Sequence, residues 1–191
     1  AVPFFPLGGD DLFLLDDLGA GPPAADFADR AGSGLARQHA CMGPRFGFPH
    51  PGWCGDSQQD NTWDDDGHRF FAQRRLLPQA IRARNDDRLD RRGLSQVEAL
   101  CARLPDLVPP QPPVLLHGDL WTGNLHCDRH GGPALVDAGA VHYGWAEAEL
   151  AMLTLFGSPP AGVFDAYAAH ATLDLRWRER APLHNLYHLL T

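Results

Sequence analysis

Asp119, Asn124 and Asp137 carry side-chain oxygens at spacings that suit one kind of chemistry. Asp119 and Asn124 have four residues between them, and Asp137 follows Asn124 by thirteen positions. This spacing is typical of a kinase catalytic loop, where the first Asp orients the attacking hydroxyl and the Asn and later Asp hold Mg²⁺. Oxygen ligands are also what Mg²⁺ prefers. A polar turn capped by Asp119 would not explain both spacings.

Short apolar segments around these residues predict how they are positioned. Val114-Leu115-Leu116 is an apolar run that leads into the loop. Residues 124–127 and 133–137 flank the link Asp128-Arg129-His130-Gly131-Gly132, and two short runs around a Gly-rich link are typical of a β-hairpin. Such a hairpin would bring Asn124 and Asp137 together at its open end, where both could share one ion.

The composition excludes several classes of protein. The 191 residues suffice for one domain, or for one lobe with part of another, and the hydrophobic content of 44% supports a core. A net charge of −8 argues against a nucleic-acid or anionic-membrane binder. The four cysteines form no C-x-x-C pair, and no apolar run approaches a membrane span. We therefore expect a cytoplasmic protein with free thiols. All sixteen cationic side chains are arginines, and lysine does not occur.

The order of expected elements predicts an α+β fold that is mainly helical. A strand at 11–15 leads into an acidic, Gly/Pro-rich segment, and this predicts a boundary between residues 1–21 and residues 22–191. The remaining pattern predicts helices at about 24–42, from 64–66 to 84, at 99–104 after a capping box at 95–98, and near 146–156, 160–171 and 176–190. This order describes the helical lobe of a kinase-like fold with a small catalytic hairpin and little of a nucleotide lobe.

Several separated stretches resemble the fructosamine kinase (ketosamine kinase) family, within the aminoglycoside phosphotransferase-like kinases. The catalytic segment His117-Gly118-Asp119-Leu120-Trp121-Thr122-Gly123-Asn124 marks the wider group, and Arg74-Arg75-Leu76-Leu77-Pro78-Gln79 adds specificity. Further matching stretches, in family order, are Leu35-Ala36-Arg37-Gln38-His39, Phe46-Gly47-Phe48, Leu135-Val136-Asp137, Tyr143-Gly144, Leu150-Ala151-Met152-Leu153, Phe164-Asp165-Ala166-Tyr167 and Leu186-Tyr187-His188-Leu189-Leu190. The resemblance covers most of the chain from about residue 10.

The resemblance implies ATP-dependent phosphorylation of a sugar hydroxyl on free or protein-bound ketosamines. By matching position it implies Asp119 as the catalytic base, Asn124 and Asp137 as Mg²⁺ ligands, Asp16, Asp17 and Leu18 as a hinge whose backbone meets adenine, and Trp121 and Tyr143 at the sugar. For both aromatic residues core packing is the alternative. The implied partner is a ketosamine, with neither nucleic acid nor membrane, and the oligomeric state stays open.

The chain also departs from the family pattern. Ala138 stands where the family usually has Pro, and Glu149 where it has Asp. We expect the second departure to weaken a helix cap or a contact to the catalytic loop, and not the chemistry itself. The Gly-rich loop, the phosphate-binding Lys and its partner Glu would all precede residue 1. The sequence therefore leads us to expect a truncated chain, a lobe fragment or a degenerate gene product, with impaired activity.

Three alternatives stay open on sequence grounds. The missing Lys favours a catalytically inactive, kinase-like binding protein, although Asp119, Asn124 and Asp137 are intact. Kinases for aminoglycosides, choline or homoserine share the same catalytic loop. Ten histidines allow a metal protein, yet His184 and His188, the pair with helical spacing, belong to no H-E-x-x-H motif, so packing is the expected role for both.

Overall fold

The computed structural model describes residues 7, 8, 13–174 and 176–191, with side chains described from residue 15 onward. Its helices are α1 (Phe27–His39), α2 (Gly67–Phe71), α3 (Leu77–Asn85), α4 (Arg91–Ala102), α5 (Leu104–Leu107), α6 (Ala146–Met152), α7 (Val163–Ala168) and α8 (Trp177–Leu190). Its strands are β1 (Leu7–Gly8), β2 (Phe13–Leu14), β3 (Gly52–Cys54), β4 (Ser57–Gln59), β5 (Val114–Leu116), β6 (Leu125–Cys127), β7 (Pro133–Leu135) and β8 (His142–Gly144). The strands pair as β1–β2, β3–β4, β5–β8 and β6–β7, all antiparallel.

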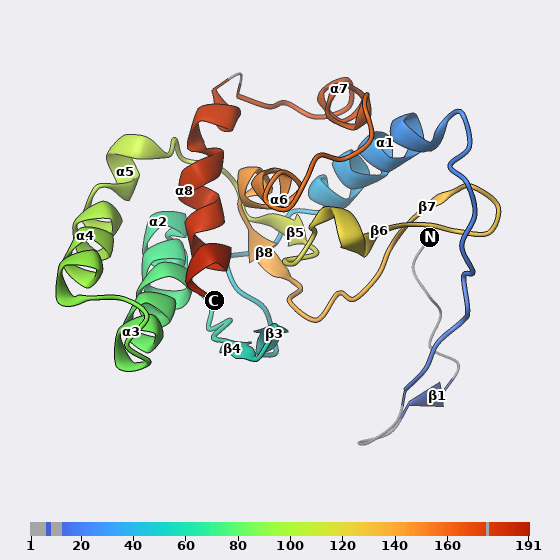
Figure 1. Ribbon diagram of the computed structural model, residues 1–191. Helices are drawn as coiled ribbons and strands as arrows, with labels where there is room; N and C mark the ends of the chain where they lie inside the picture. Colours follow the sequence, from blue (N-terminus) through green and yellow to red (C-terminus); the bar gives the residue numbers. More distant parts are fainter. Residues whose placement is uncertain (1–6, 9–12, 175) are drawn as a thin grey trace.

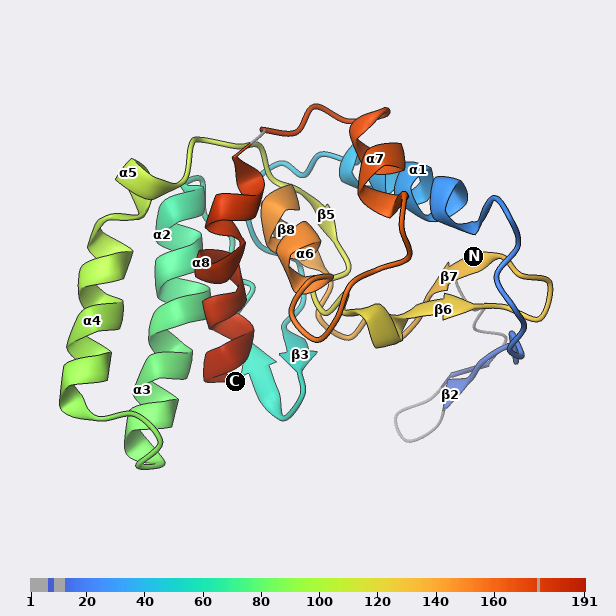
Figure 2. The ribbon, with the colours of Figure 1, turned by 45° about the horizontal axis from the view of Figure 1, so that its top comes forward.

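Two helical groups lie on either side of the β5–β8 pair (Figure 1). Helices α2, α3, α4 and α8 form one group, while α1, α6 and α7 form the other, and the view in Figure 2 keeps this arrangement. Each group buries its own apolar cluster, one around Leu76 and Leu104 and the other around Leu150 and Tyr167. Because α8 contributes Tyr187 to the first cluster and residues near its start to the second, it joins the two groups.

A close approach of two backbones fixes the second group. Gly32 of α1 lies against α7, where a Cβ atom would come within 2.3 Å of the Val163 carbonyl oxygen. Gly32-Ser33-Gly34 resembles the start of a G-x-G-x-x-G phosphate loop, but Arg37 occupies the last position, and Gly32 serves a helix–helix contact instead. Near its C-terminal end α1 also contacts β5, where the Gln38 side chain donates a 3.2 Å hydrogen bond to the Leu115 carbonyl.

The helix that we predict from the acidic run at 64–66 is confirmed. Asp66 is its N-cap, and its carboxylate accepts hydrogen bonds from the amides of His68 and Arg69 at 2.8 and 3.1 Å. The helix continues to Asn85 but contains a π-helical turn at Ala72–Leu76. Such turns concentrate at functional sites, and here the turn carries Arg75 into the protein interior.

The capping box predicted at 95–98 is wrong. Helix α4 begins earlier, because the Asp90 side chain caps it by accepting a 2.6 Å hydrogen bond from the Gly93 amide, and Ser95 lies inside the helix. Two strand pairs were also missing from the prediction. The β3–β4 hairpin lies in a region for which we predict no strand, and β8 pairs with β5 across the catalytic segment.

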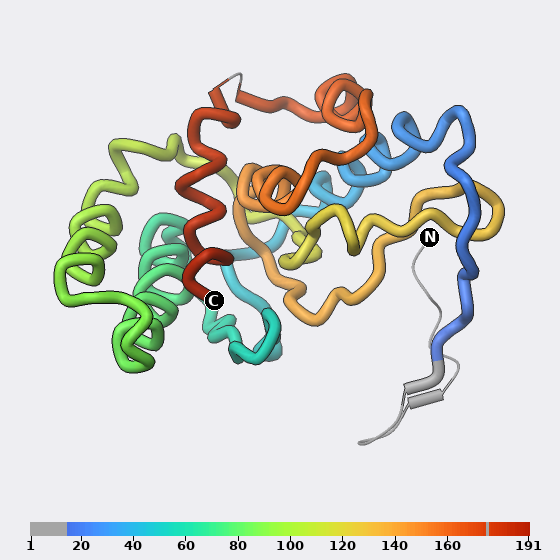
Figure 3. The backbone as a smooth tube through the Cα atoms, in the orientation of Figure 1, coloured from blue at the N-terminus to red at the C-terminus, as the bar shows by residue number. Residues whose placement is uncertain are grey.

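The segment after β2 runs along the β6–β7 hairpin (Figure 3). Backbone hydrogen bonds from Arg129 to Leu18 and from Ala24 to Gly131, both 3.0 Å, attach it there. The predicted strand at 11–15 includes Asp11 and Leu12, which lie outside the described residues, and the boundary at residue 21 stays a prediction. Within the part of the chain that is described, no helix is long and apolar enough to cross a membrane.

Replacing Asp66 by Ala should lower the free energy of unfolding by about 1 kcal/mol, because two helix amides lose their acceptor. Asp65→Ala is the matched control: Asp65 is exposed and makes one long ion pair, 3.8 Å to Arg45, so its loss should cost under about 0.5 kcal/mol. Urea denaturation measures both. Equal effects would mean that the cap contributes nothing to stability.

Candidate active site

The segment between β5 and β6 forms a tight loop that depends on a glycine. Gly118 adopts a left-handed conformation with φ of +85°, which L side chains rarely take. A Cβ atom there would come within 2.0 Å of the Ala140 carbonyl oxygen. Only glycine therefore allows the chain to turn at this point and present Asp119.

His117 ties this loop to the segment after β7 that contains Asp137. It is buried, and its Nε2 donates a 2.8 Å hydrogen bond to the Val136 carbonyl, which can only accept. That fixes the tautomer, so Nδ1 accepts a 3.4 Å bond from the Asp119 amide. The His117 imidazole thus connects the backbone of Asp119 with that of Val136, the residue before Asp137.

The structure brings Asn124 and Asp137 to the open end of the predicted hairpin, which is confirmed as β6–β7. The Val136 amide donates to the Asn124 carbonyl at 3.1 Å, and the Asn124 side-chain amide donates to the Asp119 carbonyl at 2.7 Å. Asp137 adopts a φ of +61°, an uncommon conformation for a residue other than glycine. Such local strain is concentrated at functional sites.

Asp119 and Asp137 differ in environment. Asp119 is half-buried, and burial raises its pKa; the nearby His117 opposes this shift, while the negative charge of Asp137 adds to it. Asp137 is exposed to solvent. The negative charge of Asp137 thus acts on the Asp119 carboxyl, while Asp137 itself stays accessible.

A buried carboxylate on α6 holds the loop from behind. Glu149 accepts a 2.8 Å hydrogen bond from the Gly118 amide, a 2.9 Å bond from Gln38 and a 3.0 Å bond from His39. The other nitrogen of His39 is 2.8 Å from the Tyr167 hydroxyl. Glu149 lies within α6 and not at its N-cap. Its carboxylate contacts the catalytic loop directly, through the hydrogen bond from the Gly118 amide.

The pKa of Glu149 reflects this set of donors. Burial alone would raise it, but the hydrogen bond and charge of His39, the Gly118 amide and the charge of His117 outweigh burial and hold it below the ordinary value of 4.5. The carboxylate is therefore ionised at neutral pH. The sequence singles out the Leu35–His39 stretch, but it does not indicate that side chains of this stretch contact Glu149.

The two predicted sugar-site aromatics lie in different surroundings. Trp121 is 38% exposed, with its ring packed over Gly123 and edge-on to Phe156 at 6.0 Å. Tyr143 is half-buried and packs against Phe48 and Trp63, with ring centroids 6.0 and 6.2 Å away. Trp121 is thus part of the loop and packs against its Gly123, whereas Tyr143 belongs to an aromatic cluster with Phe48 and Trp63.

The predicted hinge residues lie at the far end of the hairpin. Asp16 and Asp17 are exposed and Leu18 is half-buried. The Arg129 side chain donates hydrogen bonds to the Asp17 and Leu18 carbonyls. The hinge is therefore fixed to the same hairpin that carries Asn124 and Asp137 at its other end.

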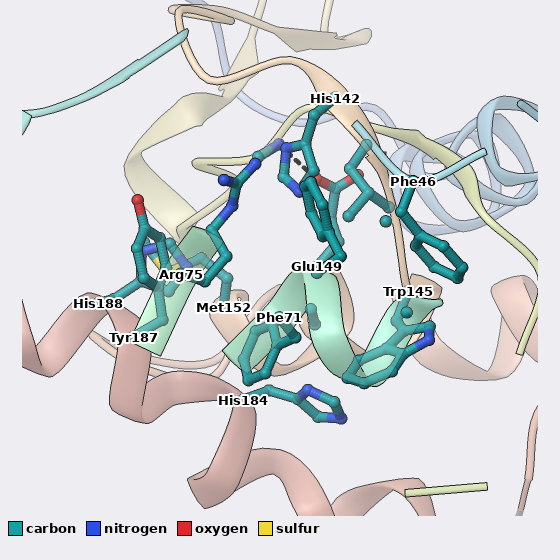
Figure 4. A pocket seen from close by; sticks show the side chains of 16 residues that line it. Phe46, Phe71, Arg75, His142, Trp145, Glu149, Met152, His184, Tyr187 and His188 are labelled. Carbon is teal, nitrogen blue, oxygen red and sulfur yellow. Dashed lines mark hydrogen bonds between the residues drawn. The ribbon is translucent and has the colours of Figure 1, made fainter. Parts of the chain in front are cut away.

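A small cavity lies beneath the loop. Its volume is about 30 Å³, room for one or two waters, and its lining includes Gly118, Glu149 and Arg75. Figure 4 shows Arg75 between His142 on one side and Tyr187 and His188 on the other. The Arg75 guanidinium is fully buried, donates to the Asp60 and Arg74 carbonyls and to Asn61, and burial lowers its pKa to about 10.

The mixed helix and strand architecture with this loop defines a protein of the kinase-like fold. Over its whole length the chain superposes on an aminoglycoside-3'-phosphotransferase of type VIII with a TM-score of 0.51, covering 74% of that chain at 20% identity, a likeness that bears on the fold alone. A crystal structure from Thermobifida fusca, assigned as a fructosamine-3-kinase, superposes with a TM-score of 0.92 at 36% identity, covering 98% of this chain and 65% of that one.

The chain belongs to the fructosamine kinase family, whose model matches residues 8–191. It is 36% identical over 171 residues to an Enterococcus faecium protein described as a probable ketoamine kinase, a match that covers 88% of this chain. The chain spans 61% of the length of that relative.

Replacing Glu149 by Gln should lower the free energy of unfolding at pH 7 by about 1–3 kcal/mol, because the new amide nitrogen faces donors from Gln38 or His39. The folded-state pKa of Glu149 is depressed, so its stabilisation is present above its ordinary value of 4.5 and is lost as pH falls through the folded-state value. The difference between wild type and variant should therefore shrink in acid.

Urea denaturation at pH 7 and at a series of lower pH values checks this expectation. Glu98→Gln, on the exposed side of α4, is the control and should match wild type throughout. A wild-type-to-variant difference that stays constant as the pH falls would contradict the assigned role of the Glu149 charge.

Proposed function

We propose that this chain provides the acceptor-side catalytic machinery of an ATP-dependent kinase that phosphorylates a sugar hydroxyl on ketosamines. The observation that supports the proposal is that the Asn124 side chain binds the Asp119 carbonyl, while the Val136 amide, next to Asp137, binds the Asn124 carbonyl. Family membership and the names of the relatives support a ketosamine as the acceptor. The substrate is the sugar-derived adduct of an amine, free or on a protein.

In the proposed reaction Asp119 accepts the proton of the attacking hydroxyl as the new oxygen–phosphorus bond forms. The bond between the γ-phosphorus and the bridging oxygen breaks, and ADP leaves with that electron pair. Half-burial favours this role, because it raises the pKa of Asp119 and so strengthens it as a proton acceptor. Positioning and electrostatics supply most of the rate in such transfers.

Asn124 and Asp137 are the proposed ligands for Mg²⁺, which would neutralise charge on the phosphates. The Asn124 amide nitrogen is engaged with the Asp119 carbonyl, so its oxygen is the atom that faces a cation, and the Asp137 carboxylate is exposed. This all-oxygen donor set fits a hard cation. The backbone of Asp16, Asp17 and Leu18 would meet adenine, and Trp121 and Tyr143 would line the sugar site.

The absence of lysine sets an expectation for the rate. Kinases hold the nucleotide phosphates with a lysine, and this chain has none. Removing one such electrostatic contact typically costs at least about 10²-fold in rate. We therefore expect impaired transfer by the 191 residues alone. The same observation favours a second candidate, a catalytically inactive protein that binds ketosamines.

Asp119→Asn should lower phosphoryl transfer from ATP to a fructosyl-amine by about 10²–10⁴-fold, because the proton acceptor is lost. Transfer of labelled γ-phosphate at high protein concentration measures the rate. Asp106→Asn, an exposed change on α5, is the control and should keep the wild-type rate. Equal rates for wild type and Asp119→Asn would remove Asp119 from the mechanism, and a wild-type rate equal to that of an intact relative would contradict impairment.

Asp137→Asn should weaken Mg²⁺-dependent binding of ADP at least about tenfold, a change of about 1.4 kcal/mol, because one anionic ligand is lost. Calorimetric titration with Mg²⁺ and with EDTA measures the binding, again with Asp106→Asn as control. Ketosamine binding that needs no nucleotide, combined with no Mg²⁺-dependent ADP binding, would favour the inactive binding protein.

A further inference from the structure

Two residues outside the proposed machinery lie directly behind the catalytic loop. Cys54 ends β3 and is buried, and its Sγ atom is 3.7 Å from Nδ1 of His188 on α8. A carboxylate oxygen of Asp119 lies within 4.8 Å of both atoms. A thiol, an imidazole and a carboxylate from three distant segments therefore converge on one point.

We propose that Cys54, His188 and Asp119 form a binding site for a thiophilic divalent cation of the zinc type. Zinc binds sulfur at about 2.3 Å and nitrogen or oxygen at about 2.0–2.2 Å, so neighbouring ligands in a tetrahedral site are about 3.4–3.6 Å apart. The Cys54–His188 separation of 3.7 Å is slightly longer than this range, so a small adjustment of the two side chains suffices. Side-chain rotation of Asp119 closes the remaining distance, and a fourth position stays open to water.

The charges around the site favour such a cation over Mg²⁺. A thiolate and a carboxylate neutralise a divalent cation, and sulfur and imidazole ligands select zinc-type metals, whereas Mg²⁺ requires oxygens. Burial lowers the pKa of His188 to about 4, with a further contribution from Arg75, so its imidazole is neutral and able to bind.

Two effects oppose binding and limit the affinity. Burial, followed by the charge of Asp119, raises the pKa of Cys54 to about 11, so the cation must displace the thiol proton. The buried Arg75 guanidinium also repels a second cation nearby. Bonding to the thiolate and the carboxylate has to exceed both costs.

A cation bound at this site would occupy the Asp119 carboxylate, which could then no longer act as the proposed proton acceptor. This consequence rests on the proposed function, but the site itself rests only on the placement of the three side chains. A zinc-type cation would then inhibit phosphoryl transfer while Asn124 and Asp137 stay available to Mg²⁺.

Titration of the 191-residue chain with Co²⁺ tests the site without any assay of activity. Co²⁺ takes the same ligands as zinc and gives a near-ultraviolet sulfur-to-metal charge-transfer band when a thiolate binds. We expect one saturable band at one equivalent, unchanged by excess Mg²⁺ and removed by zinc. Cys54→Ser should abolish the band, and Cys127→Ser, a half-buried cysteine on β6, should keep it.

Asp119→Asn is the second variant, because it preserves side-chain size and keeps the thiol. It should retain the band but weaken Co²⁺ binding at least about tenfold, since one anionic ligand is lost. Circular dichroism of each variant verifies folding. A band that persists in Cys54→Ser, or no saturable band in the folded wild type, would overturn the site. A chain that transfers no phosphate but binds Co²⁺ this way would sink the proposed function and leave the site standing.

Discussion

The buried carboxylate of Glu149 is the interaction on which the geometry of the site depends. An ionised carboxylate is costly to bury unless hydrogen bonds surround it. Here the donors come from α1, through Gln38 and His39, and from the catalytic loop, through the Gly118 amide. Since His39 is bound in turn to Tyr167 of α7, this one charge ties three helices to the loop. A shift of α1 or of the loop would remove donors that offset the cost of burying this charge.

The loop can meet this requirement only because of its own local chemistry. Gly118 supplies the left-handed turn, and His117 spans to the Val136 carbonyl with its tautomer fixed. The Asn124 side chain closes the loop on the Asp119 carbonyl. The same few hydrogen bonds therefore fix both the position of the proposed proton acceptor and its distance from the hairpin that carries Asp137.

The sequence predicts the parts of this structure that are set locally. The β6–β7 hairpin and the helix capped by Asp66 follow from turn residues and capping chemistry within a few positions. The capping box at Ser95 fails because Asp90 offers a competing cap that begins the helix earlier. The β5–β8 pairing and the meeting of Cys54 with His188 join segments far apart in the chain. Spacing along one sequence contains no signal for such contacts.

The proposed roles of Asp119 and Asp137 differ more clearly in the surroundings of the two carboxylates than in their spacing along the sequence. A proton acceptor works best with its pKa raised toward the working pH, whereas a cation ligand must stay ionised and accessible. Asp119 is half-buried, and the charge of Asp137 adds to the effect of burial on its pKa. Asp137 itself is exposed to solvent and has a positive φ of +61°. A cation bound beside Asp137 would also cancel part of the repulsion between the two carboxylates. Cation binding at Asp137 would therefore change the pKa of Asp119.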